Sequence, residues 1–483
     1  MMYTKIIHGM ISILIKNCNL FSINFECFAS TFWYIAFICN LLPSHWFIEF
    51  FVIYLHSHDS ILYSPTGQMI MSKVKSNSKL IKEGKLSYEW ARSHMQILDN
   101  TINRLKKSKP LKGITLGFCL HITKETSVLL MGAKELGATV ACCGGNPLTT
   151  QDNIAAFLAS QGINVYAWHG QSVKDYDWCI DQVLKHKPTI LTDDGADMNI
   201  KAHFDKRFKD MEILGATEET TAGVTRIRAV ENQGKLRYPV ILVNEAVTKH
   251  MFDNQYGTGQ STIDGYLRAM NLLMASKRVV VVGYGWVGRG VASRCRGMGS
   301  KVIVTEVDPV KALEAHMDGF EVMPMAQAAK IGDMFITCTG MTSVIRKEHI
   351  MKMKDGAIMG NVGHFDVEID SEFLLKKSKS VKEVRPTLDE CTLKNGKKVY
   401  LIGQGRLANL VSAEGHPPEV MAQSFSNQIL SVMYILKNHK KMENKIIDVP
   451  KEIDIQIAHD ALKAMDVKID KLTPEQVKYA NNW

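Results

Sequence analysis

Chemically capable side chains gather in four short segments of the chain: HITKET (121–126), LTDDGAD (191–197), ATEETTAGV (216–224) and NEAVTKHMFDN (244–254). Their candidate acids, bases and hydrogen-bond partners are His121, Thr123, Glu125, Thr126, Asp193, Asp194, Glu218, Glu219, Thr220, Thr221, Lys249, Asp253 and Asn254. Taken singly, each has a structural explanation: a strand-end histidine, a helix N-cap, or an exposed ion pair at i, i+4. Together, at the ends of apolar runs, they predict the cleft of an α/β enzyme.

A glycine-rich turn follows a predicted strand in RVVVVGYGWVGRG (278–290). Gly283, Gly285 and Gly288 have the spacing of a Rossmann phosphate loop, in which glycines permit a tight turn, approach to the pyrophosphate and close helix packing. Glu306 ends the next predicted strand, roughly 20 residues on, where a carboxylate binds the ribose hydroxyls and selects NAD over NADP. Strand, loop, helix, strand and acid together predict an NAD site. A glycine-rich turn without a ligand is the alternative.

Short apolar runs alternate with helix-compatible segments along most of the chain. Residues 113–144 read as strand, loop, helix, strand, and INVYAW, PTILTDD and VILVNE continue the alternation. A second α/β region starts near Asn254, and its segments TCTG (337–340) and GNVGH (360–364) follow strands, where open α/β sheets bind ligands. A long helix is expected after Ala413. The fold class predicted is therefore α/β.

Residues 1–70 differ in composition from the rest of the chain. They contain no arginine and only two lysines, whereas the sequence from Met71 is charged and helix-compatible. A membrane span over 29–55 is long enough, but a proline and a glutamate interrupt it, and a secretory signal would need a basic start. We interpret the segment as sequence upstream of a wrongly assigned start, with Met71 or Met69 as the first residue. A membrane anchor is the alternative.

Charge and cysteine usage exclude several classes of protein. The net charge is +9, and the basic residues are scattered among nearly as many acids, so no nucleic-acid partner is expected. The ten cysteines form neither zinc-type pairs nor a disulfide framework, which is typical of reduced thiols in the cytoplasm. No metal site and no membrane association are expected.

Many short motifs between about residue 83 and the C-terminus resemble those of the S-adenosylhomocysteine hydrolase family. The matching segments are HITKET, TTQDNIAA, VYAWHG, LTDDGAD, EETTAGV, VTKHMFDNQYG, GYGWVGRG, ITCTG, GNVGHFDVEID and EGHPPEVM. The resemblance implies a homotetramer with one tightly bound NAD per subunit. It implies reversible cleavage of S-adenosylhomocysteine into adenosine and homocysteine, by 3′-oxidation, elimination, water addition at C5′ and re-reduction in a dry, closed site.

The resemblance also implies roles for particular residues. Lys249, beside Asp253, helps to take the 3′-hydroxyl proton, which requires a lowered lysine pKa. Asp194 is the base for the C4′ proton, and His121 and His364 act near C5′ on the leaving thiol and the incoming water. The substrate-contacting positions are Thr123, Glu125, Thr126, Asp194, Glu219, Lys249, Asp253, His416 and Met421. The positions lining the NAD are Thr220, Thr221, Asn254, Gly283, Gly285, Val287, Gly288, Glu306, Thr339, Asn361, Gly363, His364 and Asn409.

The same reasoning divides the chain into domains. We expect a substrate-binding domain over 71–253, completed by 412–445, and a Rossmann NAD-binding domain over 254–411. Residues 446–483 are expected to be a short oligomerisation tail that contacts other subunits. It ends in KYANNW, without the lysine and tyrosine by which vertebrate-type members reach a neighbouring NAD, so NAD is expected to be held differently or to exchange faster.

Two other functions are compatible with an NAD site. A simple NAD-dependent 2-hydroxyacid dehydrogenase would need an arginine to clamp a substrate carboxylate beside a histidine–acid pair, and would leave HITKET and VTKHMFDN unexplained. A catalytically silent, hydrolase-like NAD-binding regulatory protein would be favoured by loss of a histidine, lysine or aspartate at the matched positions. None of these residues is lost.

Overall fold

The structure, a computed structural model, describes residues 62–63, 69–70 and 72–483. The interpretations of residues 1–70 as a displaced start or an anchor fall outside the described residues, apart from two short antiparallel strands, β1 (Leu62–Tyr63) and β2 (Met69–Ile70). In the part of the chain that is described, no helix has the length and apolar character needed to cross a bilayer. The seven cysteines of that part are all unpaired.

The first lobe is built on a seven-stranded sheet in which every neighbouring pair of strands is parallel. The strands, in spatial order, are β17 (Ile446–Asp448), β8 (Val240–Leu242), β7 (Gly215–Glu218), β6 (Ile190–Asp193), β3 (Thr115–Cys119), β4 (Thr139–Cys143) and β5 (Asn164–Tyr166). Their apolar residues are mostly buried, as in parallel sheets covered on both faces. The order reverses between β3 and β6, so the topological switch point of this sheet lies there.

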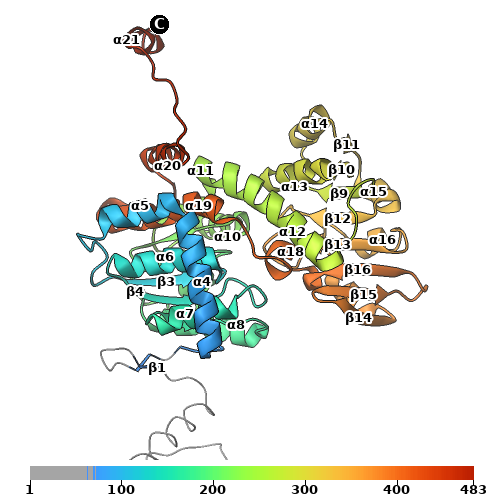
Figure 1. Ribbon diagram of the computed structural model, residues 1–483, viewed down its shortest axis with the longest axis horizontal. Helices are drawn as coiled ribbons and strands as arrows, with labels where there is room; N and C mark the ends of the chain where they lie inside the picture. Colours follow the sequence, from blue (N-terminus) through green and yellow to red (C-terminus); the bar gives the residue numbers. More distant parts are fainter. Residues whose placement is uncertain (1–61, 64–68, 71) are drawn as a thin grey trace, which may run out of the picture. The chain divides into compact units, whose positions relative to one another are not determined.

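Helices cover the first sheet and include one from far along the chain (Figure 1). They are α4 (Ser78–His94), α5 (Gln96–Leu105), α6 (Lys124–Glu135), α7 (Asp152–Ser160), α8 (Val173–Lys185), α9 (Asp197–Phe204), α10 (Thr221–Asn232) and α19 (Pro418–Asn438). The long helix expected after Ala413 is confirmed as α19. Its Phe425, Ile429 and Val432 are buried in the same core cluster as residues of α4, α5, α6 and α7. The first lobe therefore depends on a segment that follows the second lobe in sequence.

The second lobe is built on an eight-stranded sheet. In spatial order its strands are β11 (Glu321–Val322), β10 (Lys301–Thr305), β9 (Arg278–Val282), β12 (Met334–Thr337), β13 (Ala357–Asn361), β16 (Lys398–Ile402), β15 (Leu388–Thr392) and β14 (Ser380–Arg385). The first six strands of this order are parallel, and β15 runs antiparallel to both of its neighbours, β16 and β14. This is the Rossmann order, with its switch point between β9 and β12. The hairpin of β14 and β15 was not predicted.

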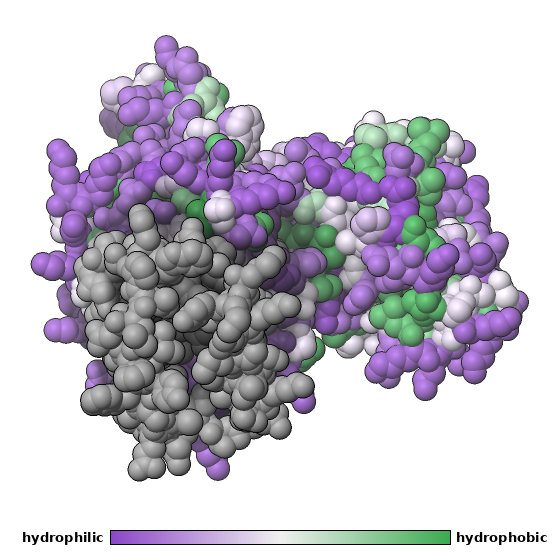
Figure 2. Space-filling view, turned by 60° about the horizontal axis from the view of Figure 1, so that its bottom comes forward, coloured by the Kyte–Doolittle hydropathy of each residue, from purple (hydrophilic) through white to green (hydrophobic). Residues whose placement is uncertain are grey.

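The helices of the second lobe follow the pattern expected for parallel strands, which need crossover connections. They are α12 (Thr258–Met270), α13 (Trp286–Gly297), α14 (Pro309–Met317), α15 (Met325–Ile331), α16 (Lys347–Ile350), α17 (Ser371–Lys377) and α18 (Ala408–Val411). On the face drawn in Figure 2, the described surface is mostly hydrophilic and the apolar side chains lie in small patches. Most of the apolar side chains of the described residues are buried between the two sheets and the helices that cover them.

The chain passes from the first lobe to the second through an irregular helix. A short helix, α11 (Val247–Lys249), is followed by a π-helical segment, η2 (His250–Gly257), and then by α12. π-Helical turns are rare and often mark functional sites, because they shift side chains out of the regular helical register. Here the irregular turns carry Asp253 and Asn254, two of the predicted site residues.

Part of the expected C-terminal tail belongs to the first lobe. Strand β17 pairs with β8 at the edge of the first sheet, and helix α20 (Lys451–Ala464) packs against α5, α11 and α19. The Asp454 carboxylate accepts hydrogen bonds from the backbone N–H groups of Val247 (2.8 Å) and Thr248 (2.8 Å). The remainder, with helix α21 (Pro474–Ala480), is exposed. The expected tail thus divides into a docked part and an exposed part.

Candidate active site

A cavity of 1350 Å³ lies at the carboxyl ends of strands from both lobes. In the first lobe its walls include residues that follow β3, β6 and β7, and in the second lobe residues that end or follow β9, β10 and β12. Both switch points therefore open onto one space. This is where the general rule for open α/β sheets places a ligand.

The cavity is lined by almost all of the predicted site residues. Every predicted catalytic and substrate-contacting residue lines it, from His121, Thr123, Glu125 and Thr126 to Asp194, Glu219, Lys249, Asp253, His364, His416 and Met421. Of the positions predicted to line the NAD, two are set behind the wall, Gly288 and Asn361. A Cβ atom on Gly288 would lie 2.0 Å from the Gly283 carbonyl oxygen, which is the close packing expected of the third glycine. Fully buried Asn361 donates to the carbonyls of Gly363 (3.0 Å) and Phe365 (2.8 Å), and so shapes that turn.

Two histidines flank one carboxylate in the first part of the site. His121 Nε2 lies 3.6 Å from Asp194 Oδ2, and His364 Nδ1 lies 3.4 Å from Asp194 Oδ1. His121 follows β3 and Asp194 follows β6, and the pairing of Cys119 with Asp193 in these neighbouring strands brings the two side chains together. His364 comes from the turn after β13 in the other sheet. The strand ends therefore assemble residues that are far apart in sequence.

Burial sets the protonation of these three groups. It lowers the pKa of His121 to about 4, although the Asp194 carboxylate opposes the shift. It also lowers the pKa of His364 to about 4. Burial raises the pKa of Asp194 above its ordinary value, against the effect of His121 and Lys249. At neutral pH the site therefore offers two neutral imidazoles and a carboxylate that is unusually ready to accept a proton.

Lys249 lies among acceptors in the second part of the site. Its ammonium donates to Asn254 Oδ1 (2.9 Å) and Asn244 Oδ1 (3.2 Å). It also lies 3.5 Å from Asp253 Oδ2 and 3.7 Å from Glu219 Oε1. The lysine and both carboxylates are buried, so the pair at i, i+4 is not the exposed ion pair that a structural explanation would require.

The charges of this second group differ from the sequence expectation. Burial lowers the pKa of Lys249, but Asp253 and Glu219 outweigh it, so that the pKa is raised, whereas the role of proton acceptor requires a lowered one. Burial raises the pKa of Asp253, but Lys249 and His416 bring it below the ordinary value. Burial raises the pKa of Glu219 to about 8, with Lys249 opposing. The ionised lysine is a hydrogen-bond donor, and Glu219 is the stronger proton acceptor.

Sequence reasoning missed several residues that hold this group in place. Ser424 donates to Asp253 Oδ2 (2.6 Å), and Gln428 donates to Glu219 Oε2. The two residues are one turn apart on α19 and are more than 160 residues from their partners in the chain. No local sequence pattern indicates these contacts. Asn244 Nδ2 donates to Thr221 Oγ1 (3.1 Å) while its Oδ1 accepts from Lys249. The position of Asn244 just after β8, at the end of a predicted strand, could have indicated a site residue.

Two more missed residues act around the first group and the cofactor loop. Thr149 Oγ1 lies 2.7 Å from His121 Nδ1 and so orients the imidazole. The buried Glu368 carboxylate accepts from the backbone N–H groups of Thr339 (2.9 Å) and Gly340 (2.8 Å), and from the Thr339 hydroxyl (2.7 Å). Glu368 therefore stabilises the turn after β12 beside the glycine-rich loop.

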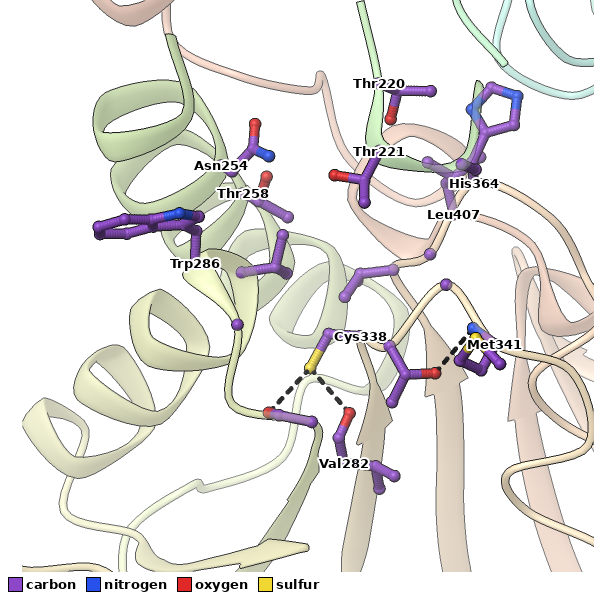
Figure 3. A pocket seen from close by; sticks show the side chains of 18 of the residues that line it. Thr220, Thr221, Asn254, Thr258, Val282, Trp286, Cys338, Met341, His364 and Leu407 are labelled. Carbon is purple, nitrogen blue, oxygen red and sulfur yellow. Dashed lines mark hydrogen bonds between the residues drawn. The ribbon is translucent and has the colours of Figure 1, made fainter. Parts of the chain in front are cut away.

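The residues around the glycine-rich loop fit a dinucleotide. A Cβ atom on Gly285 would meet open space, and Gly285 lines the cavity at the N-terminus of α13, where no side chain caps the helix. Free backbone N–H groups at such a helix end bind phosphate. Glu306 directly follows β10 beside this loop, accepts from Tyr284 N–H (2.7 Å), and lines the cavity. Figure 3 shows Trp286 and Asn254 on one side of this region, and Thr220, Thr221 and His364 on the other.

A further wall of the cavity consists of Thr123, Glu125 and Thr126 from the start of α6, with His416 and Met421 near the start of α19. Thr123 caps α6, accepting from Thr126 N–H (3.4 Å). His416 Nδ1 lies 2.9 Å from Asp253 Oδ1, and its Nε2 lies 3.1 Å from Thr258 Oγ1.

One group of side chains has the spacing of metal ligands. His121, Asp194 and His364 each offer a ligand atom, and these atoms lie within 4.8 Å of one another. The expectation from sequence was that the chain has no metal site. The same three side chains form the acid–base group described above.

Comparison with known proteins identifies the family. The model described as "S-adenosyl-L-homocysteine hydrolase" matches residues 72–213, and the model described as "S-adenosyl-L-homocysteine hydrolase, NAD binding domain" matches residues 254–415. Adenosylhomocysteinase of Sulfurisphaera tokodaii is 54% identical over 411 residues, which cover 85% of this chain and 98% of that protein. S-inosyl-L-homocysteine hydrolase of Methanocaldococcus jannaschii is 53% identical over 404 residues, covering 84% and 97%. Adenosylhomocysteinase of Aquifex aeolicus is 51% identical over 405 residues, covering 84% and 97%. This chain belongs to the S-adenosyl-L-homocysteine hydrolase family.

Proposed function

We propose that the protein reversibly hydrolyses S-adenosylhomocysteine to adenosine and homocysteine, with NAD bound in each subunit. The observation that carries this proposal is the cavity itself. One space holds a buried lysine between carboxylates, a carboxylate between two histidines, and the glycine-rich loop of a dinucleotide site. A hydrolysis that passes through a temporary oxidation needs all three.

The chemistry begins at the 3′ carbon of the ribose. NAD, when bound, supplies a place for the hydride of C3′ and later returns it, so that the overall reaction involves no net oxidation. In our proposal the Lys249 ammonium donates a hydrogen bond to the 3′ oxygen. Glu219 takes the hydroxyl proton, since its pKa of about 8 suits a base near neutral pH. This assigns the proton to Glu219 rather than to Lys249, whose raised pKa opposes that role.

The ketone at C3′ makes the C4′ proton acidic, and we assign its removal to Asp194. Its raised pKa favours the acceptance of a proton from carbon. His121 and His364, on either side of Asp194, then serve the departure of homocysteine and the addition of water at C5′. Neutral imidazoles suit these steps, because each can accept a proton from one partner and donate one to another.

The alternatives fit the site less well. A hydroxyacid dehydrogenase needs an arginine beside its histidine–acid pair. The two arginines that line the cavity are paired with glutamates, Arg289 with Glu314 and Arg346 with Glu348. Arg226 donates to Asp197 Oδ1 (2.7 Å) and to the Gly195 carbonyl, and it does not line the cavity. A silent protein would not need a buried Lys249 between two carboxylates, which is costly to maintain without a use.

We further propose a substrate-binding domain over 71–253 and 412–445, and an NAD-binding domain over 254–411. The docking of β17 and α20 supports adding 446–464 to the first of these. Residues 465–483 are then the candidate subunit contacts of a homotetramer. We also propose a cytoplasmic enzyme of one-carbon metabolism.

The test of the function is a comparison of two assays on the purified full chain. Thiol release from S-adenosylhomocysteine should be rapid, and NADH production from 2-hydroxyacids should be absent. Protein stripped of NAD should lose thiol release, and added NAD should restore it. Undiminished cleavage by the stripped protein would contradict the proposed chemistry.

A further inference from the structure

Lys124 forms an ion pair with Glu125, one of the buried carboxylates of the cavity. Glu125 lines the cavity, and its side chain is 2% exposed. The ammonium of its neighbour Lys124 lies 3.1 Å from Glu125 Oε1. Lys124 is itself largely buried, with a side chain that is 12% exposed, but it does not line the cavity. It can therefore influence a ligand only through Glu125.

The charge of Glu125 depends on this lysine. Burial raises the pKa of the Glu125 carboxyl, and Lys124 is the charged group that opposes the rise. The position of Glu125 in the first turn of α6 adds the weaker support of a helix N-terminus. Glu125 Oε1 has no hydrogen-bond partner apart from this ion pair. Without the ammonium, a carboxylate this deeply buried would become protonated far more readily.

Lys124 has a second carboxylate partner, Glu414, but Glu414 does not depend on Lys124 alone. Lys124 also donates to Glu414 Oε2 (2.9 Å), whose side chain is 57% exposed. Arg268 of α12 lies 3.3 Å from Glu414 Oε1 and shares that carboxylate. His416, two residues further on, contacts Asp253 instead. Glu414 therefore has a second cation, whereas Glu125 relies on Lys124.

The protonation of Glu125 matters because two purine bases differ at position 6. Adenine carries an amino group there, which donates hydrogen bonds, and hypoxanthine carries a carbonyl oxygen, which accepts them. An ionised carboxylate can only accept, so it pairs with the amino group and repels the carbonyl oxygen. A protonated carboxyl can donate as well, so it tolerates both. Relatives about equally similar to this chain are named for adenosyl and for inosyl substrates, so the family name alone does not decide the base.

We propose that Lys124 is the positioning residue that keeps Glu125 ionised and thereby makes the site select a 6-aminopurine nucleoside over a 6-oxopurine nucleoside. The inference rests on the proposed function, because it takes Glu125 as the group that faces position 6 of the purine base. Lys124 acts only through Glu125, and it affects the selectivity for the base rather than the chemical steps.

The experiment compares kcat/KM for S-adenosylhomocysteine and S-inosylhomocysteine between pH 6 and pH 9. The wild-type holoenzyme should prefer the adenosyl substrate, with a ratio that varies little with pH. In Lys124→Met the ratio at pH 7 should fall by about 10- to 100-fold, the value of a hydrogen bond to a charged group. The ratio should recover as the pH rises, because Glu125 then ionises without help. Lys124→Arg should retain the preference.

The matched control is Lys134→Met, a lysine near the other end of the same helix whose ammonium contacts the Gln161 carbonyl. It should leave the ratio unchanged. Glu125→Gln provides a second variant, since an amide both donates and accepts. It should lower the ratio at every pH, and adding Lys124→Met to it should change the ratio no further.

The outcomes separate the two proposals. If the wild-type protein cleaves neither substrate, the proposed function fails. If it cleaves the adenosyl substrate and Lys124→Met keeps the wild-type ratio while retaining NAD, only the role of Lys124 is overturned. A wild-type preference for the inosyl substrate would also overturn it, as would a further loss of selectivity from Lys124→Met in the Glu125→Gln background.

Discussion

At the scale of single residues, this site works by burying ionisable groups unequally. Burial shifts every group toward its neutral form, and the neighbours then decide how much of the shift remains. Lys249 keeps its charge because two carboxylates face it, whereas Glu219 shares the single lysine with Asp253 and stays easy to protonate. A pair of groups with separated pKa values is what proton transfer near neutral pH requires.

The role of Glu219 can be tested through the first hydride transfer. In single-turnover experiments with adenosine, the rate of NADH formation should rise about tenfold per pH unit below pH 8 and level off above it, because the base must be deprotonated. Glu219→Gln should lower the rate by about 100-fold or more and remove the pH dependence. Glu212→Gln, an exposed glutamate upstream, is the control. A Glu219→Gln enzyme with the wild-type pH profile would exclude Glu219 as the base.

The buried histidines also make stability depend on pH. The pKa of His364 is about 4 in the folded protein and about 6.5 when unfolded, so the unfolded chain binds the proton first as the pH falls. Its contribution to stability is therefore lost between about pH 6.5 and pH 4. Between pH 7 and pH 5, Asn in place of His364 should reduce the loss in free energy of unfolding by about 2 kcal/mol. Denaturant titrations would measure this, with His459→Asn, at an exposed position, as the control.

At the scale of elements, the order of the strands brings the site residues together. Residues that follow β3, β6 and β7 meet because those strands are neighbours, and they meet at one edge because the strands are parallel. The π-helical segment η2 then brings Asp253 and Asn254 to Lys249. That segment packs directly on the first turns of α13, which follow the glycine-rich loop.

Gly290 is the closest point of this packing. A Cβ atom there would lie 1.9 Å from the backbone oxygen of Gln255 in η2, so Gly290→Ala must push α13 and η2 apart. We expect a loss of about 1–3 kcal/mol in the free energy of unfolding, typical of overpacking, together with a loss of bound NAD. Gly297→Ala, in the same helix, meets no atom within 4 Å and should be neutral or stabilising by up to about 1 kcal/mol. Unfolding curves and NAD content after gel filtration would check both, and unchanged NAD content in Gly290→Ala would contradict the expectation.

At the scale of the whole molecule, the first lobe is not a continuous stretch of chain, whereas the second lobe is. Helix α19 and strand β17 return to the first lobe after the second lobe has been completed. They bring buried side chains to the core and two hydrogen-bond donors, Ser424 and Gln428, to the site. Folding of the first lobe is therefore coupled to residues at the far end of the sequence.

Two truncations distinguish the docked and the exposed parts of the C-terminal region. Removal of 467–483 should leave the unfolding curve and the NAD content unchanged, because those residues are exposed. Removal of 446–483 also deletes the buried Val449 and Ile457, and should cost about 3 kcal/mol or more. Native mass spectrometry of the shorter truncation tests the proposed subunit contacts: an intact tetramer would place those contacts elsewhere.

The sequence by itself determined the class of the fold and most of the site. The apolar runs predicted most strands of both sheets, because buried parallel strands have a distinctive composition, and the glycine spacing predicted the NAD loop. Strand β7 was missed because its four residues, GATE, include two polar side chains, and the hairpin of β14 and β15 because it interrupts the parallel pattern.

Only the tertiary structure decided how the site is charged. The sequence names Lys249, Glu219 and Asp194, but their protonation depends on burial and on partners such as His416 and Ser424, which lie far away in the chain. Electrostatic energies depend on distance and on exclusion of water, and neither can be read from the order of residues. For the same reason, the pairing of Lys124 with a buried Glu125 became visible only in the folded chain.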